Sequence, residues 1–220
     1  MNSITTELDH IVVAANSLDE GRHWAREVLG VSPEGGGKHD GIATHNTLIK
    51  LDGQRYLEII AIDPEAGAPL FPRWFGLDTQ EVRALIAHEP RLVAWVARCS
   101  GAPDAIERLA ASPGYDGRVV RPASRGDFRW RFSFTADGRR ISGGVMPHLI
   151  QWDCIPHPCD LLSDSGVALS SLTLGAVVPE RAVAMLEMLA FADPAVQVGQ
   201  SSSAQLVATL RTAKGTVVLD

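Results

Sequence analysis

Two side chains that can ligate a metal or transfer a proton lie inside apolar stretches of this sequence. His10 interrupts the apolar run Leu8–Ala15, and Glu58 lies between Leu57 and Ile59. Burying an imidazole or a carboxylate costs free energy unless the group is paired. Each residue therefore has either a site role or a structural one. For His10 the structural alternative is a core histidine bonded to a neighbour, and for Glu58 it is a strand end turned to solvent.

Three further polar residues lie in predicted strands. His148 is a third candidate ligand, although a slip of one residue in its strand would bring Leu149 or Gln151 inward instead. His45 is a candidate general base or ligand because imidazole titrates near neutral pH. Strand alternation also allows His45 to be a hydrogen-bonded residue at the rim. Asn46, beside it, is a candidate for substrate binding.

The segment 128–135 alternates aromatic and basic residues. Arg129 and Arg131 share one side of this predicted strand. If that side lines a site, the two guanidinium groups suit a carboxylate or phosphate of a substrate; otherwise they belong to a solvated sheet surface. Trp130 and Trp152 either form the wall of an apolar pocket, with Trp152 touching the substrate, or are core residues.

The composition is that of a globular protein and limits the function classes. The 220-residue chain has a formal net charge of -6 and no evident basic face, which argues against nucleic acid as a partner. No apolar run approaches the ~20 residues that span a bilayer, and the N-terminus lacks the regions of a signal peptide. Cys154 and Cys159 are a weak zinc signal, and an odd number of cysteines argues against a disulfide framework. We therefore expect a cytoplasmic protein without a membrane partner.

The order strand, helix, three strands is predicted three times along the chain. Ser17 and Glu20 have capping-box spacing at the first helix, Ile106 and Leu109 lie on the second, and Pro179 opens the third. Between the first two units, residues 64–91 form a connector whose aromatic side chains we expect to pack against the sheet. The predicted strands are 8–15, 38–42, 44–51 and 55–62, then 92–99, 118–121, 128–135 and 146–153, then 169–176, 196–199, 205–211 and 216–219. Residues 33–37 are predicted as a turn-rich loop.

Aligning the predicted units on one another shows which residues occupy equivalent positions. Ala94 and Ser171 fall opposite His10, and His148 falls opposite Glu58. Of these positions in the first two units, Ala94 is the one with an apolar side chain.

The tandem βαβββ order resembles the vicinal oxygen chelate superfamily, and within it the glyoxalase-like domain family. The resemblance rests on the opening strand Leu8–Ala14, on Tyr56–Ile60, and on three shorter stretches, which are Gly35–Gly37 with Thr44–Asn46, Arg129–Arg131, and Gly143–Gly144 with Leu149–Trp152. It implies an α+β fold in which tandem βαβββ units form a curled mixed sheet, shaped as a bowl, with a third degenerate βαβββ unit. We expect a glyoxalase-like domain over residues 7–153 and the third unit over residues 166–220.

The resemblance also implies a divalent metal, Zn, Fe, Mn or Ni, on the concave face, with His10, Glu58 and His148 as ligands. The expected function is a metal-dependent lyase, isomerase or dioxygenase reaction on a small oxygenated substrate, with Glu58 or His45 moving the proton. Two alternatives remain open. One is a metal-free protein that sequesters a hydrophobic small molecule. The other is a chain without activity, whose third unit supports a homodimer through an exposed sheet face.

Overall fold

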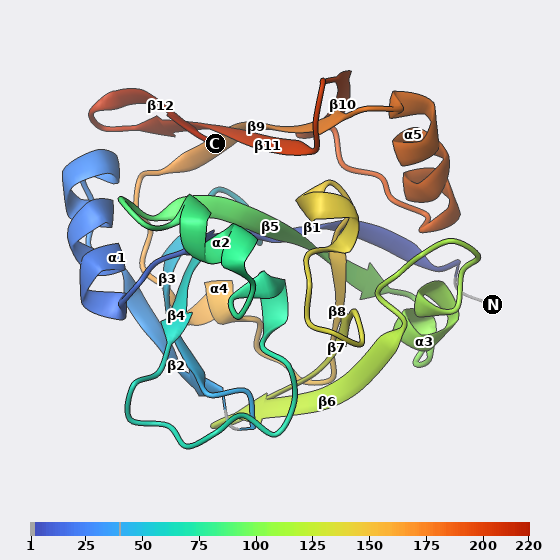
Figure 1. The fold of residues 1–220 in the computed structure, drawn as a ribbon, viewed down its shortest axis with the longest axis horizontal. Coiled ribbons are helices and arrows are strands. Elements are labelled where there is room, and N and C mark those ends of the chain that lie inside the picture. Colours follow the sequence, from blue (N-terminus) through green and yellow to red (C-terminus); the bar gives the residue numbers. More distant parts are fainter. Residues whose placement is uncertain (1–2, 40) are drawn as a thin grey trace.

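The computed structural model describes residues 3–39 and 41–220, and these residues form two sheets (Figure 1). Eight strands from the first two predicted units make the larger sheet, and the third unit makes a four-stranded one. In spatial order the strands of the larger sheet are β2 (Glu34–His39), β3 (Thr44–Lys50), β4 (Tyr56–Ile62), β1 (Thr5–Ala14), β5 (Arg91–Ser100), β8 (His148–Trp152), β7 (Phe128–Phe134) and β6 (Val119–Arg125).

The pairing of the central strands confirms the tandem βαβββ arrangement. β1 pairs in parallel with β4, the last strand of its unit, and β5 pairs in parallel with β8 in the same way. The two units join through the antiparallel pair β1–β5. The sheet curls until its edge strands β2 and β6 come into contact, so that it is nearly closed (Figure 1). The α+β fold class is therefore as the sequence predicts.

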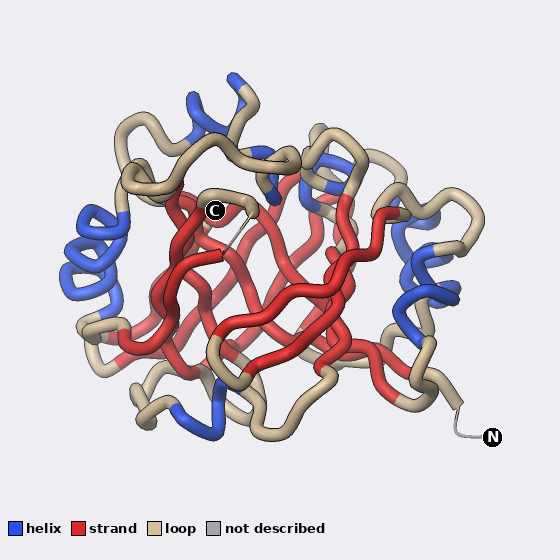
Figure 2. Tube along the Cα trace, turned by 90° about the horizontal axis from the view of Figure 1, so that it is seen from below, coloured by secondary structure: helices blue, strands red, loops and turns tan. Residues whose placement is uncertain are grey.

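The helices are short and lie around the strands (Figure 2). Ser17 caps α1 (Leu18–Trp24) by accepting a hydrogen bond from the Glu20 amide, as its spacing predicts. The other helical segments are the π-helical turn η1 (Ala25–Leu29), η2 (Trp74–Gly76), α2 (Gln80–Leu85), α3 (Ala105–Ala110), η3 (Ile141–Gly144), α4 (Pro158–Leu161) and α5 (Pro179–Met188). Among the described residues, none of these helices has the length and apolar character needed to cross a membrane.

The smaller sheet keeps the predicted element order but pairs its strands differently. It consists of β9 (Ala168–Ala176), β10 (Val196–Gln200), β11 (Gln205–Thr212) and β12 (Gly215–Leu219), in the spatial order β10-β9-β11-β12. Its first strand, β9, lies between the second and third strands. In the other two units the first strand lies beside the last. The third unit thus shares the chain order of a βαβββ unit and not its strand pairing.

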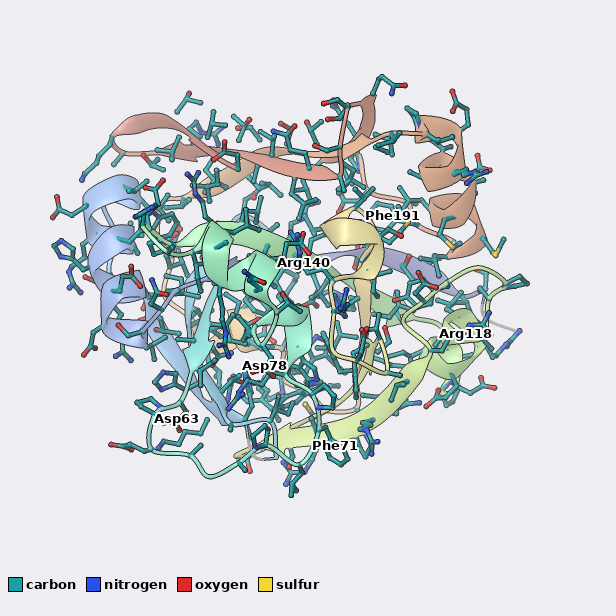
Figure 3. The ribbon with its side chains drawn as sticks, in the orientation of Figure 1. Asp63, Phe71, Asp78, Arg118, Arg140 and Phe191 are labelled. Carbon is teal, nitrogen blue, oxygen red and sulfur yellow. The ribbon has the colours of Figure 1, made fainter. Side chains whose placement is uncertain are left out.

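One face of the smaller sheet covers the convex side of the larger one (Figure 1). Leu172 and Leu206 belong to the same buried cluster as Ile11 and Val13 of β1. Phe191, labelled in Figure 3, packs edge-on against Trp95 of β5 at a ring distance of 5.2 Å. This sheet face therefore has a partner within the same chain, and a homodimer stays a prediction.

Strand β2 begins earlier than predicted, because the glycines at 35–37 form part of it. A Cβ at Gly36 would lie 2.1 Å from the carbonyl oxygen of Asn46, and Gly36 has a φ of +84°. Only glycine allows this close approach of β2 to β3. The predicted strand 38–42 includes residue 40, which lies outside the described residues.

The connector between the units enters the bowl. Trp74 and Phe75 are buried against Phe132 of β7, which confirms that the aromatic side chains of this segment pack on the sheet. Phe75 adopts the left-handed region at a φ of 59°. Phe71 lies beside β6, where Arg121 stacks on its ring (Figure 3). The concave face is thus mostly filled by the protein's own side chains.

Candidate active site

Strand register brings His10 and Glu58 together on the concave face. His10, Val12 and Ala14 point into the bowl from β1, and Glu58 pairs with Val12 across the parallel β1–β4 ladder. His10 and Glu58 are therefore diagonal neighbours. His10 Nε2 lies 3.6 Å from Glu58 Oε2, and each side chain is about 5% exposed. His10 also stacks on Tyr56, with 4.4 Å between the ring centroids.

A β-bulge places Asp9 on the other side of the His10 ring. Leu8 pairs with Ala97 and His10 with Val96, so Asp9 is an extra residue in β1. Its fully buried carboxylate accepts a hydrogen bond from His10 Nδ1 through Oδ1, at 2.6 Å. This bond fixes the proton on Nδ1 and leaves Nε2 facing Glu58.

Asp9 is held by residues that are distant in sequence. Trp152 Nε1 and His157 Nε2 donate to its Oδ2, at 3.0 and 3.1 Å. His157 accepts from the Cys159 amide through Nδ1, so the proton on its Nε2 is directed at Asp9. Burial alone would raise the pKa of Asp9, but the hydrogen bonds from His10 and His157 outweigh it and hold this pKa far below its usual range. The carboxylate is therefore charged and fixed in position.

Asn46 holds the far oxygen of Glu58. Its Nδ2 donates to Glu58 Oε1 at 2.6 Å and also contacts His39 Nε2 at 3.3 Å. Burial lowers the pKa of His39 to about 3, and the positive charge of Arg125 adds to this effect. His39 is therefore neutral, with Nε2 as an acceptor and Nδ1 donating to Thr44.

Arg125 closes the site from the edge of the second unit. It lies at the end of β6, and its Nη1 donates to Asn46 Oδ1 at 3.0 Å across the contact between β2 and β6. Its side chain passes over Gly37, where a Cβ would lie 2.8 Å from Arg125 Cδ. Both units thus contribute residues to one site.

These groups surround a small hollow. It measures about 30 Å³, which is the space of roughly one water molecule. An aromatic cavity of about 200 Å³ adjoins it and shares His39, Trp74 and Trp130 with it. A second cavity of about 180 Å³ lies on the other side of Arg125. A cavity of about 640 Å³ lies elsewhere, between α5 and η3, and its walls are mostly apolar.

His148 faces the bowl but is not brought together with His10 and Glu58. It pairs with Val96 as Glu58 pairs with Val12, which agrees with the predicted equivalence of the two positions. Its ring stacks on Phe132 and meets the edge of Phe75, and it does not line the hollow. Burial lowers the pKa of His148 to about 4. Its Nδ1 contacts the Ser133 carbonyl, and its Nε2 has no partner in the described part of the chain.

Three other predicted site residues point away from the hollow. His45 pairs with Ala61 on the outer face of β3, near α1. A role as a base would require His45 to face the bowl, and it does not. Arg131 is bound to Glu107 and Asp153 on the outer surface. Arg129 is exposed and donates hydrogen bonds to the carbonyl oxygens of Gly126 and Phe128. Trp130 and Trp152 both line the hollow.

The side chains present do not complete a metal site. Two ligands of one tetrahedral zinc ion lie about 3.4 Å apart, so the separation of His10 Nε2 and Glu58 Oε2 suits two corners. Catalytic zinc sites use three protein ligands. Within residues 3–39 and 41–220, no three His, Cys, Asp or Glu side chains are arranged to hold an ion. The equivalent of His10 in the second unit, Ala94, has no ligating atom.

Sequence reasoning missed four residues of this site, which are Asp9, His39, Arg125 and His157. The sequence places Asp9 at the edge of the first apolar run, and no local signal predicts the bulge that turns it inward. His157 lies in the linker after the second unit, and Arg125 lies near a hairpin turn. Their positions follow from the closure of the sheet and the return of the linker, which are tertiary features.

Comparison with known proteins identifies the family. The model of the glyoxalase-like domain family matches residues 8–190. This chain therefore belongs to the glyoxalase-like domain family. A search of curated proteins gave no significant match.

Comparison with solved structures found several similar proteins. A hypothetical protein from Staphylococcus aureus is similar with a TM-score of 0.61 and 12% identity, over 91% of this chain and 88% of the other. Methylmalonyl-CoA epimerase from Mycobacterium tuberculosis has a TM-score of 0.42 and 19% identity, over 68% of this chain and 88% of the epimerase. A variant of the Streptomyces coelicolor methylmalonyl-CoA epimerase, in complex with 2-nitronate-propionyl-CoA, has a TM-score of 0.44 and 16% identity, over 69% of this chain and 100% of the epimerase. The similarity to the Staphylococcus aureus protein, at 12% identity, shows the fold alone.

Proposed function

We propose that this protein is an enzyme that transfers a proton on a small oxygenated substrate, as an isomerase or lyase, with Glu58 as the base. The observation that carries the proposal is the pair of buried groups that face each other across the hollow, His10 Nε2 and Glu58 Oε2. Buried titratable groups that converge on a cavity are typical of acid–base sites.

Each polar residue has a distinct role in this reaction. Glu58 Oε2 removes a proton from a carbon next to a carbonyl group, while Asn46 holds Oε1. The electron pair of the broken C–H bond moves onto the carbonyl oxygen and gives an enolate. In the imidazolium form, which carries a second proton on Nε2, His10 donates a hydrogen bond to that oxygen, and the charge of Asp9 balances the imidazolium. Glu58 then returns the proton to carbon. In a lyase reaction, the electron pair of the enolate instead forms a double bond to the adjacent carbon as the leaving group departs with the bonding pair, and Glu58 gives its proton to that group.

No step of this reaction passes through a metal ion, because the donor set is one ligand short. The expectation of a metal held by His10, Glu58 and His148 thus becomes a question for experiment. Asn46 and Trp152 contact the hollow and are proposed to contact the substrate.

Solvent exchange tests the proposal with a panel of simple carbon acids, so the natural substrate is not required. The protein is incubated in D₂O with small 2-oxo acids, their methyl esters and simple ketones, and loss of the C–H signal next to the carbonyl is followed by ¹H NMR. We expect catalysed exchange in at least one compound, and its loss in Glu58→Gln and His10→Ala. Exchange by wild type that persists in both variants, or no exchange in any compound, would contradict the proposal.

The second candidate is a protein that sequesters an apolar small molecule. It is favoured by the cavity of about 200 Å³, whose walls include Phe71, Trp74, Trp130 and Phe134. Under this alternative, apolar ligands would raise the melting temperature in wild type and Glu58→Gln alike. Glu58 would then be a structural residue.

Location and assembly remain proposals. The cysteines Cys99, Cys154 and Cys159 are free thiols, which supports a reducing compartment such as the cytoplasm. A homodimer is testable by size-exclusion chromatography with light scattering.

A further inference from the structure

Arg125 carries a positive charge that the protein's own carboxylates do not neutralise. Within the described chain, its guanidinium makes one hydrogen bond, to the amide oxygen of Asn46, and no carboxylate oxygen lies within 4.0 Å of it. Arg131 shows the contrast, since its guanidinium binds Glu107, Asp153 and the Pro103 carbonyl at 2.6 to 2.9 Å. Arg125 thus retains donors for an external partner.

Arg125 lies between two spaces in the structure. It lines both the hollow at His10 and Glu58 and the outer cavity of about 180 Å³. Leu48 also lines both. The rest of the outer cavity is formed by Glu34, Gly35, Gly36, Phe128, Pro158, Leu161 and Leu162. The guanidinium group is thus adjacent to both spaces.

Asn46 keeps Arg125 from pairing with Glu58. Its amide accepts from Arg125 through Oδ1 and donates to Glu58 through Nδ2, so it stands between the two opposite charges. A direct ion pair would occupy both groups and weaken Glu58 as a base. With Asn46 between them, Oε2 of Glu58 faces His10, and the guanidinium is free to bind an anion.

We infer that Arg125 binds a carboxylate of the substrate, so that the enzyme acts on small carboxylic acids that carry a carbonyl group near the anionic end. This inference rests on the proposed function. A guanidinium presents two parallel N–H groups that match the two oxygens of a carboxylate. The outer cavity, at about 180 Å³, offers space for a small molecule beside this guanidinium. Arg125 also offsets the negative charge that a substrate carboxylate would bring near Glu58.

The test compares each acid with its neutral ester. We would measure dissociation constants by NMR titration, and exchange rates in D₂O, for 2-oxobutanoate and 2-oxopentanoate and for their methyl esters. The proteins are wild type, Arg125→Gln, Arg125→Lys and Arg139→Gln. Arg139 is a matched control because its side chain is 71% exposed and lies outside the site.

The expected result is selective. Arg125→Gln weakens binding of the acids about 10-fold to 100-fold and leaves the esters unchanged, in line with the worth of a charge-assisted hydrogen bond. Arg125→Lys retains part of the preference, and Arg139→Gln behaves as wild type. Equal losses for acid and ester, no loss, or failure of wild type to bind either acid would overturn the inference.

The two proposals can fail separately. If the acids bind through Arg125 but wild type catalyses no exchange, proton transfer is wrong and the anion site stands. If exchange depends on Glu58 but acids and esters respond alike to Arg125→Gln, proton transfer stands and the substrate class is wrong. Thermal unfolding of each variant separates loss of binding from loss of folding.

Discussion

Asp9 and His10 are adjacent in the chain, yet their side chains are hydrogen-bonded to each other, with 2.6 Å between Asp9 Oδ1 and His10 Nδ1. Neighbouring residues of a regular strand point to opposite faces, so this contact requires the bulge at Asp9. The bulge adds a residue to β1 and in doing so gives the imidazole of His10 a fixed tautomer. The orientation of His10 Nε2 toward Glu58 depends on it.

The first prediction concerns the charge of Asp9. Asp9→Asn keeps the size of the side chain but removes the charge that balances a protonated His10. We expect the exchange rate in D₂O to fall about 10-fold to 100-fold, as for outer partners of functional histidines. Asp19→Asn, at a side chain that is 94% exposed, is the control. An unchanged rate in Asp9→Asn would show that the hydrogen bond is only structural.

The second prediction concerns the close approach of β2 to β3. Gly36→Ala places a methyl group 2.1 Å from the Asn46 carbonyl oxygen at a φ of +84°. Gly53→Ala is the matched control, since Gly53 has a φ of +66° and its added Cβ meets nothing within 4 Å. We expect Gly53→Ala to cost about 1 kcal/mol of unfolding free energy and Gly36→Ala to cost about 2 kcal/mol more. Equal losses in urea denaturation would show that β2 can move away without cost.

The third prediction is a dependence of stability on pH. Burial lowers the pKa of His148 to about 4 in the folded protein, against about 6.5 in the unfolded chain. Between these values the unfolded chain binds a proton that the folded protein does not, so the unfolding free energy falls as the pH falls from 6.5 toward 4. The loss from His148 amounts to about 3 kcal/mol, and His39 acts in the same direction.

Urea denaturation at several pH values measures this dependence. His148→Gln removes one titrating group, so its unfolding free energy should depend less steeply on pH than that of wild type. The exposed His23 provides the control variant His23→Gln. Parallel curves for wild type and His148→Gln would mean that His148 titrates normally in the folded protein.

The fourth prediction concerns metal content. His10 and Glu58 supply two ligands, and the described chain offers no third close by. We expect elemental analysis of protein purified without added metal to find well below one divalent ion per chain, and exchange to persist after chelation. One ion per chain that is lost in both His10→Ala and Glu58→Ala would contradict this and restore the metal-dependent reaction.

The sequence predicts the larger sheet well because its signals are local and repeated. The apolar runs at β1, β4, β5 and β8 fix the strands, and the duplicated order fixes their pairing. The third unit carries the same order, but its first strand pairs with its second and third strands, which the repeated order does not predict. The start of strand β2 is mispredicted because glycines usually signal turns, whereas here they permit close strand contact.

The candidate site was predicted only in part, because some of its residues are positioned by tertiary contacts and not by local sequence patterns. His10 and Glu58 follow from strand parity, which the sequence shows directly. The curl of the whole sheet determines which face of a strand points into the bowl. As a result, Arg129 and Arg131 lie on the outer surface, whereas Arg125 reaches Asn46 at the site. The bulge at Asp9 and the return of His157 have no local signature, so sequence periodicity could not reveal them.

The central claim is that Glu58 acts as a base across the hollow from His10. It is tested most directly by the deuterium exchange rate of the best carbon acid with wild type, Glu58→Gln, Glu58→Asp and the control Glu180→Gln. We predict a loss of about 10²-fold to 10⁴-fold in Glu58→Gln, partial recovery in Glu58→Asp and an unchanged rate in Glu180→Gln. A folded Glu58→Gln protein that exchanges as fast as wild type would contradict the claim.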